Sequence, residues 1–378
     1  MNYNLGRVAI IADQMTDFGG ADREMLSVLK LFPHADIYTV LYNPSKYSHI
    51  GIKQNVYTSF AQKLPFKFSI SRHLKVLNPI AYENFNFDKY DTLISISAGP
   101  ARNIIPGIYQ KHIAMIMTPP RSLWDNELNV RSSKLKSIYK PLSKIINNYQ
   151  RILDVTTIPR VDHWIANSKF ISQKIKKRYG VKSTVIYPGI DTESFRDISN
   201  KEIDTVLKKH NLPKEFFLCV SRLYDYKRVD WAIKSCIKTN KNLVVVGKGP
   251  DDKYLKKISK GYKNIYFLGF LNNDNEVQVL YKEAQSLLFC GIEDFGLVPI
   301  EAMAQGTPII AYNRGGVIET VSNGQTGEFF NNESELTNIL NHFNKSMYNP
   351  KIVINRAKDF TEEKFLENLE NYLSQIYE

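Results

Sequence analysis

Two glutamates and a predicted helix start lie close together in the segment from residue 293 to residue 308, EDFGLVPIEAMAQGTP. Glu293 opens the segment, and Glu301 follows eight positions later. Gly296 permits close approach of the backbone, and Gly306 is the residue type that commonly follows a helix end. The pattern predicts a helix from about Leu297 to Gln305, directly after a buried strand.

The start of this helix is suited to binding an anion. Its first amides have no partner within the helix, and they point out of the carboxyl end of the preceding strand, where an open α/β sheet binds ligands. A diphosphate or the hydroxyls of a sugar fit such a place. One glutamate could accept hydrogen bonds from a sugar and the other from a ribose. Two glutamates at this spacing are usually a coincidence on a solvated surface, but the whole segment is much rarer.

Two cations follow another predicted strand, which ends at Val220. Arg222 and Lys227 are five positions apart in the segment SRLYDYK. A guanidinium offers bidentate hydrogen bonds and an ammonium offers a compact charge, so the two could hold a diphosphate together. Alone, such a pair is most often a surface feature. The segment around Glu293 makes the functional interpretation stronger.

Short runs rich in valine and isoleucine alternate with longer amphipathic stretches, which is typical of parallel sheets covered by helices. The first series of predicted strands comprises Val8–Ala12, Ala35–Val40, Thr92–Ser97, Ile113–Met117, His163–Ala166 and Thr184–Tyr187. The second comprises Phe217–Val220, Leu243–Val246, Ile265–Leu268, Ser286–Cys290 and Ile309–Ala311. We therefore expect an α/β protein with two domains, 1–188 and 189–354, and a helix at 355–378 that packs back on the first.

The composition is that of a globular enzyme. Of 378 residues, 43% are hydrophobic, and the three cysteines are too few and too scattered for a disulfide framework or a zinc cluster. No export signal is visible at the start of the chain, and no segment has the roughly 18 to 20 apolar residues that span a membrane. We expect a cytoplasmic protein.

The formal net charge of +12 favours partners that carry phosphate. Basic residues are dense from Arg131 to Arg151, with apolar residues between them at helical spacing, and again from Lys174 to Lys182. Solvated helix faces and peripheral contact with the inner face of an anionic membrane explain this charge equally well. We expect no nucleic acid partner, because no helix-turn-helix, RNP or zinc-finger pattern accompanies the charge.

The segment around Glu293 resembles the E-x7-E motif of glycosyltransferase family 4, and the resemblance covers nearly the full length. The further matching segments are the glycine loop Gly19-Gly20-Ala21-Asp22-Arg23, the segments Thr118–Asp125 and Ile165–Ser168, the R-x4-K pair of Arg222 and Lys227, the turn Gly247–Pro250, and the loop Asn313–Gly327. The motifs of the second half are the more specific ones.

This resemblance implies the GT-B fold, in which two Rossmann-like domains with parallel sheets face each other across a cleft. The first domain would bind the acceptor and the second the sugar-nucleotide donor. The reaction would be a retaining hexosyl transfer without metal or cofactor. The residues that the resemblance assigns to catalysis are Arg222, Lys227 and Glu293, and those it assigns to donor binding are Gly19, Gly20, Arg222, Lys227, Gly249, Glu293, Phe295, Gly296, Leu297 and Glu301.

Within the family, the segments Thr118–Asp125 and Tyr312–Gly316 most resemble bacterial O-antigen and capsule mannosyltransferases. The expected donor is GDP-mannose, and a UDP-hexose is the open alternative. The expected acceptor is a glycan or an oligosaccharide carried on a lipid diphosphate.

Met117 departs from the family pattern, because many members have a histidine before this Thr-Pro pair. A methionine cannot hydrogen-bond a sugar hydroxyl or share a proton well. The alternative function is therefore a catalytically weak or inactive subunit that binds carbohydrate or a partner transferase. Asp17 and Glu24 flank the glycine loop, and we expect both at the surface.

Overall fold

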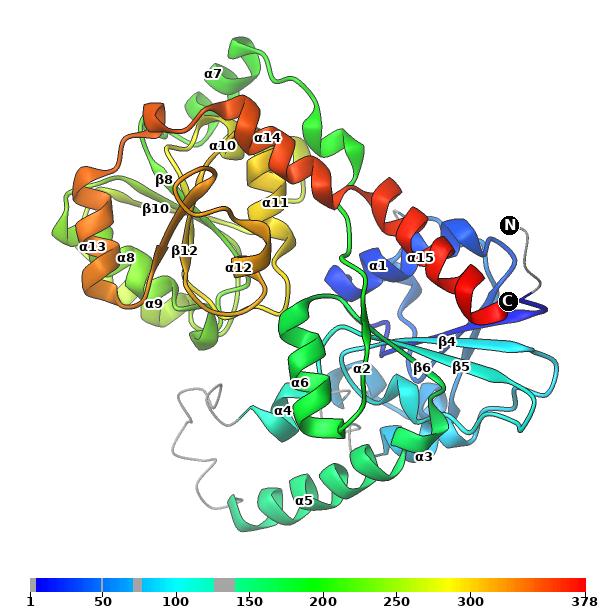
Figure 1. Cartoon of the computed structure of the whole chain (residues 1–378). Coiled ribbons are helices and arrows are strands. Elements are labelled where there is room, and N and C mark those ends of the chain that lie inside the picture. Colours follow the sequence, from blue (N-terminus) through cyan, green and yellow to red (C-terminus); the bar gives the residue numbers. More distant parts are fainter. Residues whose placement is uncertain (1–4, 49, 71–76, 126–139) are drawn as a thin grey trace. The chain divides into compact units, whose positions relative to one another are not determined.

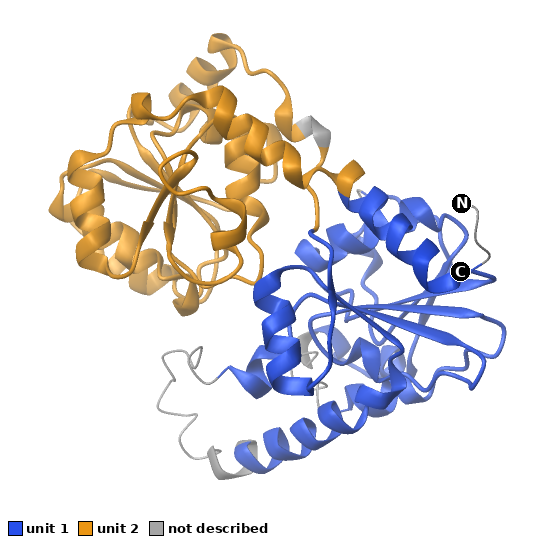
Figure 2. Cartoon of the chain, viewed as in Figure 1, with its two compact units in different colours: residues 1–187, 365–378 blue, residues 188–364 orange. Residues whose placement is uncertain are grey.

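The computed structural model describes residues 5–48, 50–70, 77–125 and 140–378. The chain forms two compact units (Figure 2). Unit 1 contains residues 1–187 and 365–378, and unit 2 contains residues 188–364. Each unit has a parallel sheet between helices, so the predicted α/β class is confirmed.

The described part of unit 1 forms a seven-stranded parallel sheet in the order β3-β2-β1-β4-β5-β6-β7. The strands are β1 Val8–Ala12, β2 Asp36–Thr39, β3 Val56–Thr58, β4 Thr92–Ser97, β5 Lys111–Ile116, β6 His163–Ala166 and β7 Thr184–Val185. The central strands are buried on both faces, which their runs of valine, isoleucine and alanine permit. The chain order reverses between β1 and β4, where open α/β sheets bind ligands.

Helices cover both faces of this sheet (Figure 1). The helices of unit 1 are α1 Gly20–Leu31, α2 Lys67–Ile70, α3 Asn78–Glu83, α4 Arg121–Trp124, α5 Lys140–Thr156, α6 Lys169–Tyr179 and α15 Glu362–Tyr377, of which α15 begins in unit 2. On one face, α1 and α15 share a core with the central strands, and on the other face α3 and α6 contribute buried residues.

The described residues of unit 2 form a six-stranded parallel sheet in the order β10-β9-β8-β11-β12-β13. The strands are β8 Phe217–Val220, β9 Leu243–Val246, β10 Ile265–Gly269, β11 Leu287–Phe289, β12 Ile309–Tyr312 and β13 Gly327–Phe330. The helices are α7 Asn200–Lys209, α8 Val229–Lys238, α9 Asp252–Ile258, α10 Asp274–Glu283, α11 Leu297–Ala304, α12 Val317–Thr320, α13 Glu333–His342 and α14 Pro350–Ala357. Here the chain order reverses between β8 and β11.

The three cysteines, Cys219, Cys236 and Cys290, lie free and buried in the core of unit 2. Burial raises the pKa of the Cys219 thiol to about 12, and it also raises the pKa values of the Cys236 and Cys290 thiols well above their ordinary value. These side chains therefore act as small apolar groups.

The C-terminal segment is not the single helix that we expected over 355–378. Helix α14 ends at Ala357, a short 3-10 turn follows at Lys358–Phe360, and α15 starts at Glu362. The side chains of Phe365, Leu369 and Leu373 then enter the core of unit 1. In the described part of the chain, no helix is both long and apolar enough to cross a bilayer.

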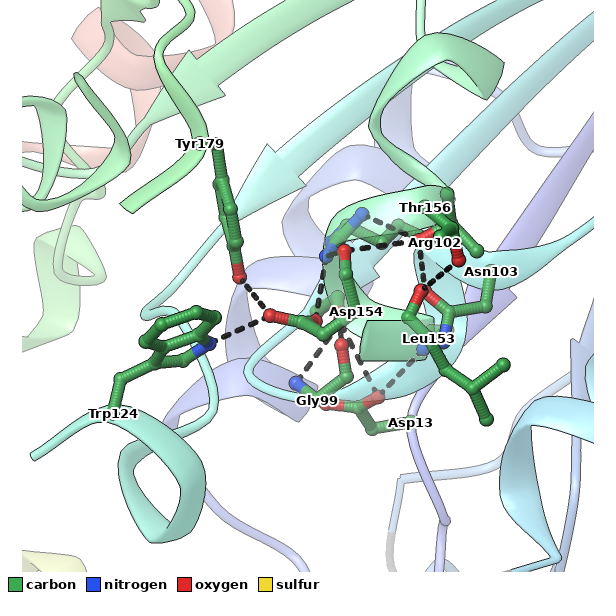
Figure 3. Close-up of polar contacts among 12 residues, drawn as sticks. Asp13, Gly99, Arg102, Asn103, Trp124, Leu153, Asp154, Thr156 and Tyr179 are labelled. Atoms are coloured by element: carbon green, nitrogen blue, oxygen red, sulfur yellow. Dashed lines mark hydrogen bonds and ion pairs between the residues drawn. The ribbon is translucent and has the colours of Figure 1, made fainter. Parts of the chain in front are cut away.

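A buried ion pair holds α5 onto unit 1 (Figure 3). The guanidinium of Arg102 donates to Asp154 over 2.6 Å, and the two side chains are only 1% and 4% exposed. The same carboxylate accepts hydrogen bonds from Trp124 Nε1 at 2.7 Å and from the Tyr179 hydroxyl at 3.0 Å. One aspartate thus joins four segments of the chain.

Because both charges of this pair are removed from water, we expect Asp154→Ala to lower the free energy of unfolding by about 3–5 kcal/mol. The change would leave the Arg102 cation buried without its counterion. Denaturant titration of the full chain measures the effect. The matched control is Asp359→Ala, which breaks exposed contacts with Arg356 and Lys364 and should cost less than about 1 kcal/mol. Equal losses in the two variants would contradict this account.

We expected Glu24 at the surface, but it is buried on α1 and only 7% exposed. It lies one turn before Val28, which faces the core. Burial alone raises the pKa of its carboxyl to about 8. The prediction was wrong because charge type alone does not reveal which side of a helix a residue faces.

The raised pKa of Glu24 makes stability depend on pH. The folded protein binds this proton up to about pH 8, whereas the unfolded chain releases it near its ordinary value of 4.5. The contribution to stability is therefore complete below pH 4.5 and is lost as the pH rises through about 8. As the pH rises, we expect the free energy of unfolding of Glu24→Gln to increase relative to that of the wild type, by on the order of a few kcal/mol. Denaturation at several pH values tests this, and a constant difference would contradict it.

Candidate functional site

The predicted helix after the strand at 287–289 is present as α11, and its start is open. It begins at Leu297, after Gly296, whose φ of +95° lies in the left-handed region that favours glycine. No side chain caps the first turn, so its amides remain available to a ligand. This region lies at the carboxyl end of β11, beside the reversal of strand order. Gly296 is therefore required by the backbone and helps to shape the helix start.

Lys227 and Glu293 form an ion pair at the same place. Lys227 ends a 3-10 turn, Asp225–Lys227, in the loop after β8, and Glu293 lies in the loop after β11. The lysine side chain is 10% exposed and the glutamate side chain 19%. A pair this far removed from water is strongly held only while both charges remain. Of the predicted catalytic residues, these two are brought into direct contact.

Gly291 allows this contact, although no motif in the sequence points to it. A side-chain carbon at Gly291 would lie 3.0 Å from the Cα of Lys227. Because glycine has no side chain, the turn that carries Lys227 can pack closely against the end of β11. Its position, just after a buried strand and just before Glu293, was the signal that could have pointed to it.

Arg222 is exposed in the same loop, before the 3-10 turn. Its guanidinium carbon lies 5.8 Å from the centre of the Tyr224 ring. The side chain is thus presented to solvent from the strand end that also leads to Lys227. An exposed guanidinium at this place can meet an incoming phosphate with two donors.

Gly249 holds the loop of Arg222 in place. A side-chain carbon there would come within 2.2 Å of the Leu223 carbonyl oxygen. The backbone on either side of Gly249 is hydrogen-bonded to Leu223. The Leu223 amide donates to the Lys248 carbonyl over 3.0 Å, and the Asp251 amide donates to the Leu223 carbonyl over 3.1 Å. The glycine therefore serves close packing of two loops, and its expected donor contact stays a prediction.

The loop with Gly315 and Gly316 packs against the backbone of Glu293. Gly315 has a φ of +89°, and a side-chain carbon there would lie 2.4 Å from the Glu293 carbonyl oxygen. The Gly316 amide donates to that oxygen over 2.9 Å. In the structure the two glycines fix the position of Glu293.

Glu301 lies in the second turn of α11 and accepts a hydrogen bond from the Tyr281 hydroxyl at 2.9 Å. Tyr281 is buried on α10, and its own carbonyl accepts from the Thr307 hydroxyl. The carboxylate orientation is thus set by a residue that the sequence analysis did not select. A tyrosine at the buried end of an amphipathic helix carries no signal for this role.

Phe295 does not present its ring to a ligand. Its side chain is 4% exposed and packs edge-on against Phe360, with ring centres 5.6 Å apart. The role predicted for Phe295 in donor binding stays a prediction. Leu297, the first residue of α11, is partly exposed.

Arg228 is a further residue at this strand end that the sequence analysis missed. Its φ of +52° is unusual for a residue with a side chain. Its guanidinium packs against the rings of both Trp231 and Tyr312, at 4.6 and 4.5 Å from their centres. These contacts offset the cost of the backbone conformation. Arg228 therefore joins the loop of Lys227 to the end of β12.

Gly19 and Gly20, predicted to bind the donor, belong to unit 1, where they begin α1. Gly19 donates its amide to Asp22 over 2.8 Å, and the space around Gly20 is open. Neither has a positive φ. The bare backbone at this helix start remains accessible.

The carboxyl edge of the sheet in unit 1 also carries Asp13, which lies directly after β1 (Figure 3). Its carboxylate accepts from the Ala98 amide at 2.7 Å and the Ala101 amide at 3.2 Å. Burial raises its pKa to about 6. Met117, directly after β5, packs into the core that α1 also lines and is 8% exposed. Its side chain therefore offers no proton acceptor here.

Metal-binding side chains do not gather in this structure: within the residues described, no three histidine, cysteine, aspartate or glutamate side chains lie where they could hold an ion.

Two family models match the chain. The family described as "Glycosyl transferases group 1" matches residues 201–364, and the one described as "Glycosyltransferase Family 4" matches residues 36–194. The first covers the site of unit 2, and the second covers most of unit 1.

Several curated proteins are similar in sequence. The chain is 27% identical over 296 residues to alpha-1,3/1,6-mannosyltransferase ALG2 of Dictyostelium discoideum, which covers 67% of this chain and 68% of that protein. It is 28% identical over 258 residues to ALG2 of Saccharomyces cerevisiae and spans 48% of that protein. It is 27% identical over 233 residues to the alpha-monoglucosyldiacylglycerol synthase of Acholeplasma laidlawii, covering 58% of this chain and 56% of that protein.

Solved structures agree with the fold. Anabaena Alr3699/HepE, in complex with UDP and glucose, superimposes with a TM-score of 0.72 at 18% identity, covering 98% of this chain and all of that one. The lipopolysaccharide glycosyltransferase WaaG gives a TM-score of 0.60 at 14% identity, with 93% of each chain covered. The predicted GT-B fold is confirmed, and the chain belongs to glycosyltransferase family 4, as an enzyme of the hexosyltransferase class.

Proposed function

We propose that this chain transfers mannose from GDP-mannose, with retention of configuration, onto a glycan or a lipid-diphosphate-linked oligosaccharide. The observation that carries the proposal is the ion pair of Lys227 and Glu293 beside the uncapped start of α11. The mannosyltransferase relatives support the choice of sugar. A UDP-hexose is the competing donor, because the solved relatives include a UDP complex.

Different residues of unit 2 bind different parts of the sugar nucleotide. Arg222 and Lys227 hold the diphosphate, and the amides at the start of α11 add hydrogen bonds of the same polarity. Glu293 accepts from hydroxyls of the sugar, and Glu301 accepts from the ribose. Glu293 also keeps the Lys227 ammonium in position before the donor arrives.

The reaction needs little from the protein beyond this positioning. The bond between the anomeric carbon and the diphosphate oxygen breaks, and the acceptor oxygen forms its bond on the same side. A diphosphate oxygen takes the acceptor's proton, so no protein base is required there. Arg222 and Lys227 stabilise the charge that develops on the departing diphosphate.

The second candidate is a weak or inactive subunit that binds carbohydrate or a partner transferase. Met117 favours it, since a buried thioether replaces a side chain that could hydrogen-bond the sugar. The two candidates differ in turnover, because only the first releases nucleoside diphosphate when donor and acceptor are both present.

Donor binding is tested first by thermal unfolding with GDP, UDP, ADP and their sugar conjugates. A ligand at a hundred times its dissociation constant stabilises a protein by about 2.7 kcal/mol. We expect GDP and GDP-mannose to raise the unfolding temperature and Arg222→Ala to abolish the shift. The control Lys238→Ala removes an exposed cation that pairs with Glu333 and should leave the shift unchanged.

The outcomes separate the alternatives. If only UDP conjugates raise the unfolding temperature, the donor is a UDP-sugar and not GDP-mannose. If none of the nucleotides raises it, the transferase proposal is refuted. A shift without release of nucleoside diphosphate on supplying glycan acceptors would favour the inactive subunit.

The contact of Tyr281 with Glu301 gives a finer test. We expect Tyr281→Phe to weaken nucleotide binding by about fivefold, because one hydrogen bond that orients the carboxylate is lost, worth about 1 kcal/mol. Calorimetric titration measures the dissociation constant. The matched control is Tyr348→Phe, whose hydroxyl donates to Glu328 elsewhere in unit 2. Equal affinities in both variants would show that Glu301 does not meet the nucleotide.

A further inference from the structure

Unit 2 carries an open cavity of about 510 Å3 beside β13, the edge strand of its sheet, named here the edge cavity. Strand β13 contributes Glu328 and Phe329 to its lining, and helix α13 contributes Glu335, Asn338 and Ile339. A volume of this size is in the range of small-molecule binding sites. The donor residues proposed above lie where β8 and β11 leave the sheet, and none of them lines this cavity.

The turn that leads into β13 also lines the edge cavity, with Asn323 and Gly324. It belongs to the loop 313–327, which carries part of the family resemblance. The turn is held by the Ser322 amide, which donates to the Thr326 hydroxyl over 2.8 Å. Gly324 has a φ of +74°, and no atom lies within 4 Å of the place where its side chain would begin. The turn is therefore fixed, and the space beside its glycine is open.

The charge of the lining excludes an anionic ligand. Among the described residues that line the edge cavity there is no lysine, arginine or histidine, whereas Glu328 and Glu335 are both present. A chain with a formal net charge of +12 thus offers here a surface that repels phosphates and carboxylates. The ligand of this cavity is neutral or cationic, so the cavity is not a second nucleotide site.

The hydrogen bonds of the two carboxylates favour a neutral ligand. Glu335 Oε2 accepts from the backbone and side-chain amides of Asn331 at 2.8 and 2.9 Å, and Oε1 accepts from the Asn332 side chain at 2.9 Å. Glu328 Oε1 accepts from the Tyr348 hydroxyl at 2.6 Å, and its Oε2 has no partner in the described part of the chain. One open carboxylate oxygen is too little for an ammonium group, which donates three hydrogen bonds.

The remaining polar groups suit hydroxyls. The exposed side chains of Asn323 and Asn338 each offer a donor and an acceptor, and Glu328 Oε2 adds a charged acceptor. A hydroxyl both donates and accepts, so a ligand with several hydroxyls can use all three side chains.

The apolar part of the lining suits a ring with C–H faces. Ile339 and Phe329 are partly buried, and Met347 is 73% exposed at the rim. Tyr348, which orients Glu328, is itself stacked on Phe343 with ring centres 5.6 Å apart. Apolar side chains beside groups that bind hydroxyls match the two kinds of surface that a pyranose presents.

We propose that the edge cavity binds a neutral sugar residue. Glu328, Asn323 and Asn338 hold its hydroxyls, and Ile339 and Met347 cover a C–H face. The chemistry is the same for a free hexose and for one residue of a glycan chain. In a glycosyltransferase such a site retains a glycan without occupying the donor residues. The inference goes beyond the proposed function, because binding here needs neither a donor nor turnover.

Saturation-transfer NMR titration of the full chain with methyl α-mannoside, methyl α-glucoside and an α-linked mannotriose tests the proposal. We expect binding of at least one glycoside. Asn338→Trp fills the cavity from an exposed helix position and should weaken that binding by at least about tenfold. Glu328→Gln replaces the charged acceptor by an amide and should weaken it by about fivefold or more.

The matched control is Asn341→Trp, which makes the same change at an exposed position of α13 outside the cavity and should bind like the wild type. The proposal fails if the wild type binds no glycoside, or if Asn338→Trp binds as tightly as this control. Binding of cadaverine in place of glycosides would show that the ligand is an organic cation. Tighter binding of the mannotriose than of the methyl mannoside identifies a glycan chain as the ligand, and equal binding identifies a single hexose.

The same variants separate this inference from the proposed function. Asn338→Trp should keep the thermal shift with nucleotides, because none of the donor residues lines the edge cavity. That retained shift also shows that the variant is folded. Sugar binding that depends on Asn338, in a chain that shows no nucleotide shift, would refute the transferase proposal alone. A nucleotide shift in a chain that binds no glycoside would refute this inference alone.

Discussion

The parallel pairing of β8 with β11 is the constraint on which the site of unit 2 depends. Both strands end at the same edge of the sheet, and the chain leaves them in opposite directions, so the loops after them meet with no helix laid across the edge. One loop supplies Lys227 and the other Glu293, and glycines at 291 and 315 let backbone come close enough for the contact. The geometry comes from topology, and the side chains supply only the charge.

The sequence predicts the interior of this fold well and its margins less well. Strands such as Val8–Ala12, Thr92–Ser97 and Leu243–Val246 have the predicted bounds. A short apolar run rich in β-branched residues is typical of a central strand that is buried on both faces of a parallel sheet. The strands at 56–58 and 327–330 were missed. They lie at the sheet edges, where partial exposure admits Tyr57 and Glu328 and removes the apolar signal.

The sequence also predicts the charged residues of the site, but it does not predict which residues they contact. Arg222, Lys227, Glu293 and Glu301 are selected by local motifs, whereas Tyr281 is selected only by contact with Glu301 across 20 positions of chain. Helix α5 shows the same limit. Its amphipathic pattern predicts a helix, but the side that faces the protein is decided by Asp154 and its partners on three other elements.

The chemistry of the three cysteines has a practical consequence. All three thiols are buried, and their raised pKa values keep them out of the thiolate form that reacts with maleimides and iodoacetamides. A cysteine introduced at an exposed position therefore reacts first, without prior removal of the native ones. One such residue in each unit would carry a fluorophore pair, so that the distance between the units could be followed in solution while substrates are added.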